Sequence, residues 1–248
     1  MAGEQPHPEA TNVIVGWADD LGTSTTFVLL RHGETEHTAE RRFSGGTGRG
    51  GDPVLNERGR SQAARAAEQL VRVAGEPGTH HAPHPPIDVV LASPMARTLE
   101  TASIVAEALG LPVSKAAGFR ECDFGLWDGL TYDQVRREHG VGLSEWFSST
   151  EVAPPGGESF AQVQDRITAA RDEVVREYAG RTVLVVTHVT PIKSMVRLAL
   201  GAPTTALYRM ELAPCSLSSI EWYSDGAVSL RFFNDTAHLS GLSGRPIT

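Results

Sequence analysis

FVLLRHGE, at residues 27–34, is a run of four apolar residues that ends at a cation and an imidazole. An apolar run bounded by polar residues predicts a fully buried strand. In open α/β sheets, ligands bind in the crevice outside the carboxyl ends of such strands. We therefore expect Arg31 and His32 to lie at a ligand site at one edge of a sheet.

The same pattern occurs twice more along the chain. Residues 87–92 (IDVVLA) lead into a helical pattern whose first turn carries Arg97, and residues 183–187 (VLVVT) run directly into His188. Because the carboxyl ends of parallel strands meet at one edge of a sheet, these three crossings predict two arginines and two histidines in one place.

Two guanidinium groups beside two imidazoles predict a site for a tetrahedral dianion. Arginine offers planar, paired donors that match phosphate oxygens, and it stays charged at any working pH. Free N–H groups at helix N-termini add to the same field. A neutral imidazole is nucleophilic near pH 7 and can form a covalent intermediate. The residues themselves thus favour a phosphate site with a histidine nucleophile.

Further motifs resemble, in order and spacing, the histidine phosphatase superfamily of phosphoglycerate-mutase-like proteins. The resemblance covers about residues 26–236. More narrowly, the chain is similar to the acid phosphatase domain that follows a ribonuclease H domain in actinobacterial two-domain proteins. The motifs that carry the resemblance are RHGET (31–35), FSG (43–45), LNERG (55–59), SPMART (93–98), ECDFGLWDG (121–129), GGES (156–159) and TH (187–188).

This resemblance implies an α/β fold: a three-layer sandwich with a mostly parallel central sheet and helices on both faces. It also implies site residues: His32 as the phosphorylated nucleophile, Arg31, Arg97 and His188 as the phosphate pocket, and Glu121 as proton donor to the leaving oxygen. The substrate-binding set then extends to Thr38, Ser44, Gly45 and Val189. Thr38 stands where family members often have Asn, and its hydroxyl can still donate a hydrogen bond.

Glu121 also fits the chemistry, since an alkoxide leaves poorly unless it is protonated. A carboxyl with a raised pKa can donate that proton and then act as base toward water. Asp123 is the rival donor, and Glu34 either orients a catalytic group or caps a helix. Because His32 must be neutral while Glu121 is protonated, we expect a bell-shaped rate profile centred below neutral pH.

These features predict a metal-independent phosphomonoesterase of the acid phosphatase type, which hydrolyses small phosphate monoesters through phosphohistidine. Two alternatives stay open. The segment PPGGES at 154–159 resembles the phosphatase branch, which includes ribazole-5′-phosphate phosphatases of cobamide synthesis as well as broad acid phosphatases. Mutases move a phosphoryl group between hydroxyls, but they usually carry a longer, more basic insertion after the acid motif. A non-catalytic phosphate-binding module is disfavoured because all five pocket positions are present.

Four aromatic residues bear on the choice of substrate: Phe43, Trp127, Trp146 and Phe147. Large aromatic side chains are more often core residues than substrate contacts. We therefore expect them in the core, with a wall beside the pocket as the alternative.

Composition narrows the classes of partner. The 248 residues are 40% hydrophobic and 21% charged, which is ordinary for a folded domain. The formal net charge of −8 argues against nucleic acid as a partner of this domain. No apolar run approaches the ~20 residues that span a bilayer. The polar start of the chain lacks a signal-peptide pattern, so we expect a cytoplasmic protein that binds no membrane.

The histidines and cysteines outside these motifs do not have the spacing of a metal site, so we expect no metal and no cofactor. His80, His81 and His84 lie in a stretch rich in Pro and Gly, without carboxylates or thiolates at ligand spacing. Cys122 and Cys215 are expected to be free thiols.

The chain divides by composition into a tail or linker (1–24), the phosphatase domain (25–240) and a flexible C-terminal tail (241–248). The resemblance implies two partners: a small phosphorylated substrate, and a covalently linked ribonuclease H domain in a longer protein.

Local signals also predict several elements within the domain. Asn56 is an N-cap residue for a helix reaching Val71, residues 95–109 form a helix that ends at Gly110, and residues 159–178 form an amphipathic helix. Thr190 is the expected N-cap of a later helix, with Pro191 at its first position. Residues 207–233 alternate and predict strands, with Asp225-Gly226 as the hairpin turn.

Overall fold

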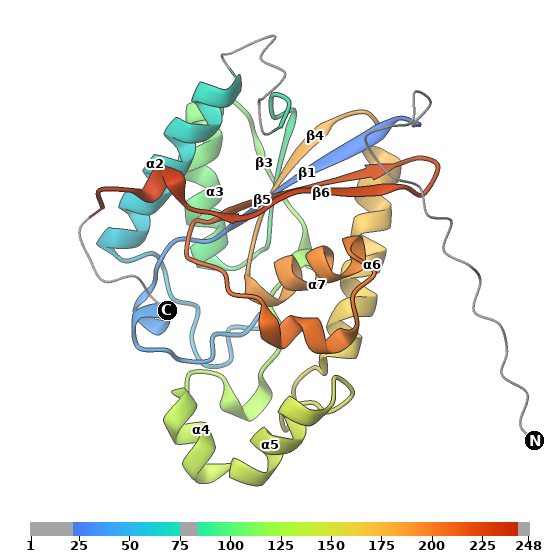
Figure 1. The fold of residues 1–248 in the computed structure, drawn as a ribbon. Helices are drawn as coiled ribbons and strands as arrows, with labels where there is room; N and C mark the ends of the chain where they lie inside the picture. Colours follow the sequence, from blue (N-terminus) through green and yellow to red (C-terminus); the bar gives the residue numbers. More distant parts are fainter. Residues whose placement is uncertain (1–21, 75–83, 243–248) are drawn as a thin grey trace, which may run out of the picture.

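Strand β1 (Ser24–Arg31) lies inside a six-stranded sheet in the computed structural model, which describes residues 22–74 and 84–242 (Figure 1). The strand order is β3-β2-β4-β1-β5-β6. The first four strands in this order are parallel, and β5 runs antiparallel to both of its neighbours. The sheet is therefore mostly parallel, as the sequence predicts. The other strands are β2 (Val89–Ala92), β3 (Val113–Lys115), β4 (Thr182–Thr187), β5 (Leu217–Tyr223) and β6 (Val228–Asp235).

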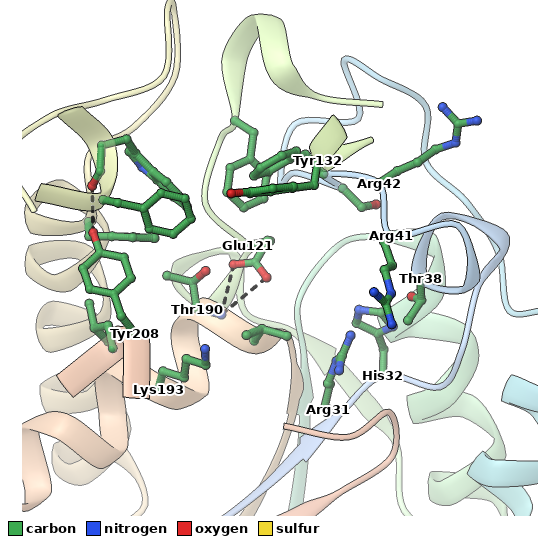
Figure 2. Close-up of a pocket in the computed structure, with 18 residues that line it drawn as sticks. Arg31, His32, Thr38, Arg41, Arg42, Glu121, Tyr132, Thr190, Lys193 and Tyr208 are labelled. Carbon is green, nitrogen blue, oxygen red and sulfur yellow. Dashed lines mark hydrogen bonds between the residues drawn. The ribbon is translucent and has the colours of Figure 1, made fainter. Parts of the chain in front are cut away.

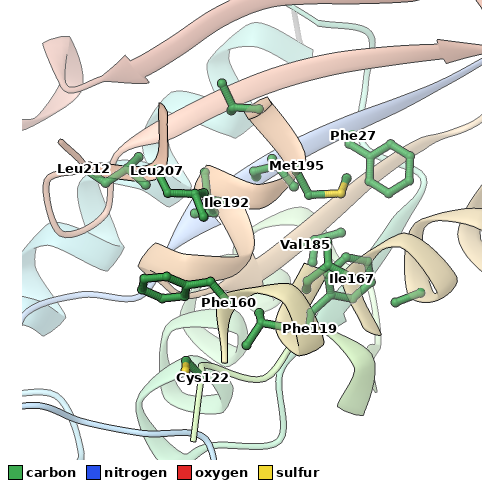
Figure 3. Close-up of a cluster of buried hydrophobic side chains, with 14 of the residues drawn as sticks. Phe27, Phe119, Cys122, Phe160, Ile167, Val185, Ile192, Met195, Leu207 and Leu212 are labelled. Atoms are coloured by element: carbon green, nitrogen blue, oxygen red, sulfur yellow. The ribbon is translucent and has the colours of Figure 1, made fainter. Parts of the chain in front are cut away.

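Helices cover both faces of the sheet because its central strands are apolar on both faces. Along β1, Phe27 and Leu29 belong to one buried cluster and Val28 and Leu30 to the other, as the alternation of side chains along a strand requires. The first cluster is closed by α6 and α7, and part of it is drawn in Figure 3. The second is closed by α2 and α3. The result is the predicted three-layer sandwich.

The helices that make these layers are α2 (Glu57–Ala74), α3 (Ala96–Leu109), α6 (Phe160–Glu177) and α7 (Val189–Ala199). Short helices fill the connections at the carboxyl ends of the parallel strands: α1 (Glu36–Ala39), α4 (Tyr132–Glu138), α5 (Gly140–Ser148) and the 3₁₀-helices η1 (Ala117–Phe119), η2 (Gly125–Trp127) and η3 (Thr204–Arg209). The chain ends its described part with η4 (Ala237–Leu239). In Figure 1, α4 and α5 lie together at the bottom of the view, away from the sheet.

Three predicted helix boundaries are confirmed. The Asn56 side-chain oxygen accepts a hydrogen bond from the backbone N–H of Gly59 at 2.8 Å, which caps α2. Gly110 ends α3 in the left-handed conformation with φ of 68°. Ser159 forms a capping box with Gln162 at the start of α6. These ends are local in origin, which is why the sequence shows them.

The predicted start of α7 is wrong by two residues. The helix begins at Val189 with His188 as its N-cap, so Thr190 and Pro191 lie inside the first turn. Proline is tolerated there because the first N–H groups of a helix have no intrahelical acceptor. Because the helix starts earlier than predicted, His188 itself lies at the N-terminus of α7.

The predicted C-terminal strands are correct only from Leu217 onward. Residues 204–209 form η3 instead, with Leu207 buried in the first cluster. Pro214 interrupts any strand before β5 because it cannot donate to a ladder. The hairpin turn is confirmed: Gly226 has φ of 92°, and the Asp225 carboxylate accepts from the N–H of Ala227 at 2.9 Å.

Candidate active site

The three strand-to-helix crossings bring the two arginines and two histidines together. Arg31 ends β1 and His32 follows it, Arg97 lies in the first turn of α3 after β2, and His188 follows β4. The rings of His32 and His188 lie 5.2 Å apart between centroids, at an interplanar angle of 63°. All four residues are therefore at the same edge of the sheet, as the sequence predicts.

His32 is held in one orientation and one tautomer. Its Nδ1 lies 2.8 Å from the carbonyl oxygen of Gly33. A carbonyl can only accept, so Nδ1 carries the proton and Nε2 carries the free lone pair. Burial lowers the pKa of His32 well below its ordinary value, and the charges of Arg97 and Arg31 lower it further. The imidazole is thus neutral and nucleophilic at Nε2.

The loop after His32 is fixed by two glycines in backbone contact. A Cβ on Gly33 would lie 2.5 Å from the carbonyl oxygen of Gly59, and a Cβ on Gly59 would lie 2.1 Å from that of Glu34. Only glycine fits at both positions. The Glu34 side chain accepts from Asn56 Nδ2 at 3.0 Å, and Gln62 Oε1 accepts from the Glu34 N–H at 2.9 Å. Of the two predicted roles for Glu34, these contacts support the structural one at the start of α2.

Arg97 is a fully buried guanidinium behind His32. Its Nη2 donates to the carbonyl oxygens of Ser44 and Gly45, each at 3.0 Å. Its Nη1 lies 3.5 Å from a carboxylate oxygen of Asp52. Its Nε has no hydrogen-bond partner within the described part of the chain. Arg97 therefore keeps a positive charge and a donor near His32 while it fixes the loop that carries Ser44.

Arg31 carries a second buried positive charge into the site. Its Nη1 donates to the carbonyl oxygen of Leu212. Burial lowers the pKa of Arg31 to about 10, with Glu121 opposing that shift. The guanidinium therefore remains charged at neutral pH.

His188 is buried and stands at the N-terminus of α7. Its Nε2 lies 2.7 Å from the hydroxyl oxygen of Ser93. Among the described residues its Nδ1 has no partner. Burial lowers the pKa of His188 well below the ordinary value, with Arg97 and His32 adding to the shift. The helix N-terminus next to it favours an anion at this place.

Glu121 is aimed at the same place from the loop after η1. Its Oε1 accepts hydrogen bonds from the N–H groups of Cys122 at 2.9 Å and Thr190 at 3.2 Å. The rival, Asp123, instead accepts from the N–H of Gly125 at 2.9 Å and the hydroxyl of Thr47 at 3.4 Å. Only Glu121 of the two lines the cavity described below.

An ion pair between Arg166 and Glu158 holds the backbone around Glu121. Arg166 donates to both carboxylate oxygens of Glu158, at 3.2 and 2.9 Å. It also donates to the carbonyl oxygens of Gly118, Arg120 and Glu121, at 2.8, 2.9 and 3.4 Å. Glu158 accepts in turn from the N–H of Asp123 at 3.0 Å. We call this arrangement the Glu158–Arg166 clamp.

A cavity of about 570 Å³ opens over these groups (Figure 2). Six of the predicted site residues line it: Arg31, His32, Thr38, Ser44, Glu121 and Val189. Arg97, His188 and Gly45 do not line it; they lie behind, in contact with residues that do. The predicted site is thus a layer of lining groups supported by a second, buried layer.

The cavity has two chemically different ends. The charged end consists of Arg31, His32, Thr38, Arg41, Ser44 and Glu121. The aromatic end consists of Phe43, Phe124, Tyr132, Trp146, Phe147, Phe160 and Tyr208. Three of the four aromatic residues singled out from sequence are therefore wall residues. Trp127 is the exception, since it is 1% exposed and packs against the ring of Phe43 at 5.8 Å.

Sequence reasoning missed several lining residues, among them Arg41, Tyr132, Lys193 and Tyr208. Lys193 had a readable signal, because it lies four residues after Val189 and so shares its face of α7. Arg41 had a weaker one: it takes a positive φ of 55° after α1, which places its side chain toward His32 and Thr38 in Figure 2. Tyr132 and Tyr208 come from separate short helices and gave no local signal.

The described residues contain no group of three or more His, Cys, Asp or Glu side chains arranged to hold a metal ion. His80 and His81 lie outside the described residues. His84 is buried, and its Nδ1 donates to the carbonyl oxygen of Pro85 at 2.7 Å. Cys122 and Cys215 are free and buried, as predicted. Within the described ranges, no helix is long and apolar enough to cross a bilayer.

The fold and the site together define an α/β protein with a histidine and arginine anion site at the carboxyl ends of parallel strands. A family model, "Histidine phosphatase superfamily (branch 1)", matches residues 27–236. The chain belongs to the histidine phosphatase superfamily, which confirms the family predicted from its motifs.

Curated relatives carry several names. "Bifunctional protein Rv2228c" of Mycobacterium tuberculosis is 43% identical over 90% of this chain, and the chain spans 57% of that relative's length. "Phosphoserine phosphatase 1" of Hydrogenobacter thermophilus is 32% identical over 86% of this chain and 93% of its own length. "Probable phosphoglycerate mutase GpmB" of Salmonella paratyphi C is 30% identical over 85% of this chain and 93% of its own.

Solved structures share the fold. Bacillus stearothermophilus YhfR superposes with a TM-score of 0.74 at 29% identity, over 87% of this chain and 99% of its own. A mycobacterial glucosyl-3-phosphoglycerate phosphatase in complex with VO3 superposes with a TM-score of 0.72 at 26% identity, over 85% of this chain and 99% of its own. These neighbours include phosphatases by name.

Proposed function

We propose that the protein is a metal-independent phosphomonoesterase of the acid phosphatase type, which hydrolyses small phosphate monoesters through a phosphohistidine at His32. The observation that carries this proposal is the hydrogen bond from His32 Nδ1 to the carbonyl of Gly33, 2.8 Å long, beside a cavity rich in guanidinium groups. It leaves Nε2 as the free nucleophilic atom. Relatives named as phosphatases support the same reaction class.

In the first step, Nε2 of His32 attacks phosphorus and the bond from phosphorus to the ester oxygen breaks. The leaving oxygen takes its proton from the carboxyl of Glu121, and the alcohol departs. Arg31, Arg97 and His188 stabilise the charge on the transferring phosphoryl group. In the second step, water attacks phosphorus, Glu121 takes a proton from it, and the bond to Nε2 breaks. Phosphate is released and both residues are restored.

Glu121 is the better donor of the two carboxyl groups near the motif. It lines the cavity with its carboxylate held by Cys122 and Thr190, whereas the oxygen of Asp123 is engaged by Gly125. A proton donor must come within hydrogen-bond reach of the leaving oxygen. This geometry supports Glu121.

Phosphoryl transfer of the mutase type is the second candidate, because one relative at 30% identity is named a probable mutase. The aromatic end of the cavity favours hydrolysis, since its lining is mostly rings. The cations near the rings are Lys193 and Arg42, and Arg42 is paired with Glu40, which leaves few charges to hold a phosphorylated acid in two orientations. A mutase would isomerise its substrate faster than it releases phosphate.

The test is phosphate release from phenyl phosphate at pH 5 to 6 in excess chelator, for the wild type and His32→Ala. We expect the variant to lose at least about a thousandfold in kcat. His139→Ala, which removes an imidazole outside the cavity lining, is the control and keeps full activity. Alkaline quenching of the wild type with labelled substrate should trap a phosphoprotein that is stable in base and labile in acid, as a phosphohistidine is. A wild type that is inert, or active only with added metal, refutes the proposal.

We also propose the limits of the domain as residues 25–240 and a cytoplasmic location. In a longer protein, a ribonuclease H domain would be linked covalently to this one. The length of the mycobacterial relative, of which this chain spans 57%, and its bifunctional name support a second domain. Mass and domain analysis of the protein purified from its source would decide this.

A further inference from the structure

Lys193 places an ammonium group in the cavity at the border between its charged and aromatic ends. The residue lies on α7, one turn after Val189, and both line the cavity. In Figure 2 its nitrogen points into the cavity, between Tyr208 and Glu121 in this view. Among the described residues, Lys193 makes no hydrogen bond and no ion pair. It is therefore a cation in the binding cavity that no nearby side chain neutralises by contact.

The proposed reaction does not use this charge. The phosphoryl group is surrounded by Arg31, Arg97 and His188, which lie at the strand ends. Glu121 is held by two backbone N–H groups rather than by the lysine. Burial lowers the pKa of Lys193 and Arg31 lowers it too, while Glu121 and the exposed Glu211 raise it. An ammonium partly removed from water is costly unless an anion pairs with it.

The neighbours of Lys193 on the other side are rings. Tyr208 uses its hydroxyl to donate to the carbonyl oxygen of Trp146 at 2.8 Å, so its polar tip is already engaged. Phe160 packs against Trp146 at 4.7 Å and against Tyr208 at 5.8 Å between ring centroids. The volume of about 570 Å³ is in the range of pockets that hold drug-sized ligands, well beyond one phosphate.

We propose that Lys193 binds a carboxylate on the leaving group, so that the substrates are phosphate monoesters whose apolar or aromatic body carries one carboxylate. A single ammonium is a compact point charge that matches one carboxylate, whereas a second phosphate would need several donors, as at the charged end. The rings hold the body, the strand ends hold the phosphate, and Lys193 selects the acid. This inference rests on the proposed function, because it concerns the leaving group of that reaction.

The test compares two esters that differ in charge and little in shape: 4-carboxyphenyl phosphate and 4-carbamoylphenyl phosphate. We expect the wild type to prefer the carboxylate in kcat/KM by about tenfold, the scale of one charge-assisted hydrogen bond. Lys193→Met should bring the ratio of the two kcat/KM values close to one. Lys115→Met, at the exposed end of β3, is the matched control and keeps the wild-type ratio. Equal losses on both esters in Lys193→Met would mean that the lysine acts on Glu121, and would overturn the proposal.

A binding measurement separates this inference from the proposed function. The probes are 4-carboxybenzylphosphonate and its carboxamide, which cannot be hydrolysed, titrated calorimetrically into the wild type and Lys193→Met. Tighter binding of the carboxylate that disappears in Lys193→Met supports the site even if no ester is turned over, in which case the proposed function alone fails. Turnover of both esters with no preference, and no difference in phosphonate binding, leaves the phosphatase standing and refutes the role of Lys193.

Discussion

The charged and aromatic ends of the cavity are built in different ways. At the charged end, His32 and His188 follow adjacent parallel strands, and backbone groups fix the side chains of His32, Arg97 and Glu121. At the aromatic end, rings from loops, from short helices and from the start of α6 pack on one another, and Phe147 and Tyr132 remain 44% and 43% exposed. The first construction fixes atoms for chemistry. The second provides a surface that can change by substitution without disturbing the sheet.

The largest expected effect comes from replacing Arg97, which belongs to the buried layer behind the charged end. Arg97→Met should lower kcat for phenyl phosphate by about a hundred- to a thousandfold, since it removes a charge that stabilises the transition state. Steady-state kinetics measure this. Arg65→Met, on the exposed face of α2, is the control and should be silent. A normal circular dichroism spectrum with a loss below about fivefold would contradict the assignment of Arg97.

The next effect concerns the Glu158–Arg166 clamp, which we assign as a positioning device for Glu121. Glu158→Gln should lower kcat by about tenfold for alkyl phosphates, because the proton donor is less well placed. For 4-nitrophenyl phosphate, whose leaving group needs no proton, the loss should be small. The dependence of kcat on leaving-group pKa therefore steepens. A uniform loss across all leaving groups would indicate a purely structural role.

A smaller effect is expected at the aromatic end. Phe147→Ala should raise KM for phenyl phosphate about threefold to tenfold and leave glycerol phosphate nearly unchanged, because only an aromatic leaving group reaches the ring. Val141→Ala, on the same helix α5 and 77% exposed, is the matched control. Equal changes on both substrates would mean that the two ends are not separate in function.

The smallest expected effect is a shift in the pH at which His32 titrates. Burial, Arg97 and Arg31 lower the pKa of His32, so the acid limb of kcat/KM should lie below pH 6.5 in the wild type. Arg97→Met should move the His32 titration, followed by NMR, to higher pH.

The lowered pKa values of His32 and His188 also mean that the unfolded state binds protons below pH 6.5 that the folded state does not. The free energy of unfolding should therefore fall as pH drops below 6.5.

The two ends also differ in what the sequence reveals. Arg31, His32 and His188 were predictable because each follows an apolar run, and strand ends converge by a general rule. Asn56 and Gly110 were predictable because helix caps are local. Lys193 was readable in part, because it shares a face of α7 with Val189. Tyr132 and Tyr208 meet the site only through tertiary packing of short helices, which no periodicity encodes.

The errors have the same origin. Thr190 has the right chemistry for an N-cap, yet its N–H is used by Glu121, a contact between residues distant in sequence. The alternation of apolar and polar residues that begins at Leu207 predicted a strand, but Leu207 lies in the 3₁₀-helix η3 and its side chain enters the core. Where tertiary contacts outweigh local preference, single-residue signals mislead.

The direction of β1 bears on how this domain can be tethered. The strand's first residue, Ser24, and its last, Arg31, are separated by about 23 Å of extended backbone at ~3.3 Å per residue. A protein fused ahead of residue 22 would therefore join at the far side of the sheet from the cavity. A fusion after residue 242 would begin past β6, which runs in the same direction as β1 and ends on the cavity's side. Attachment ahead of β1 leaves the cavity mouth open to substrate, whereas the chain that follows β6 packs through η4 against α2, so a protein attached there would begin beside that helix.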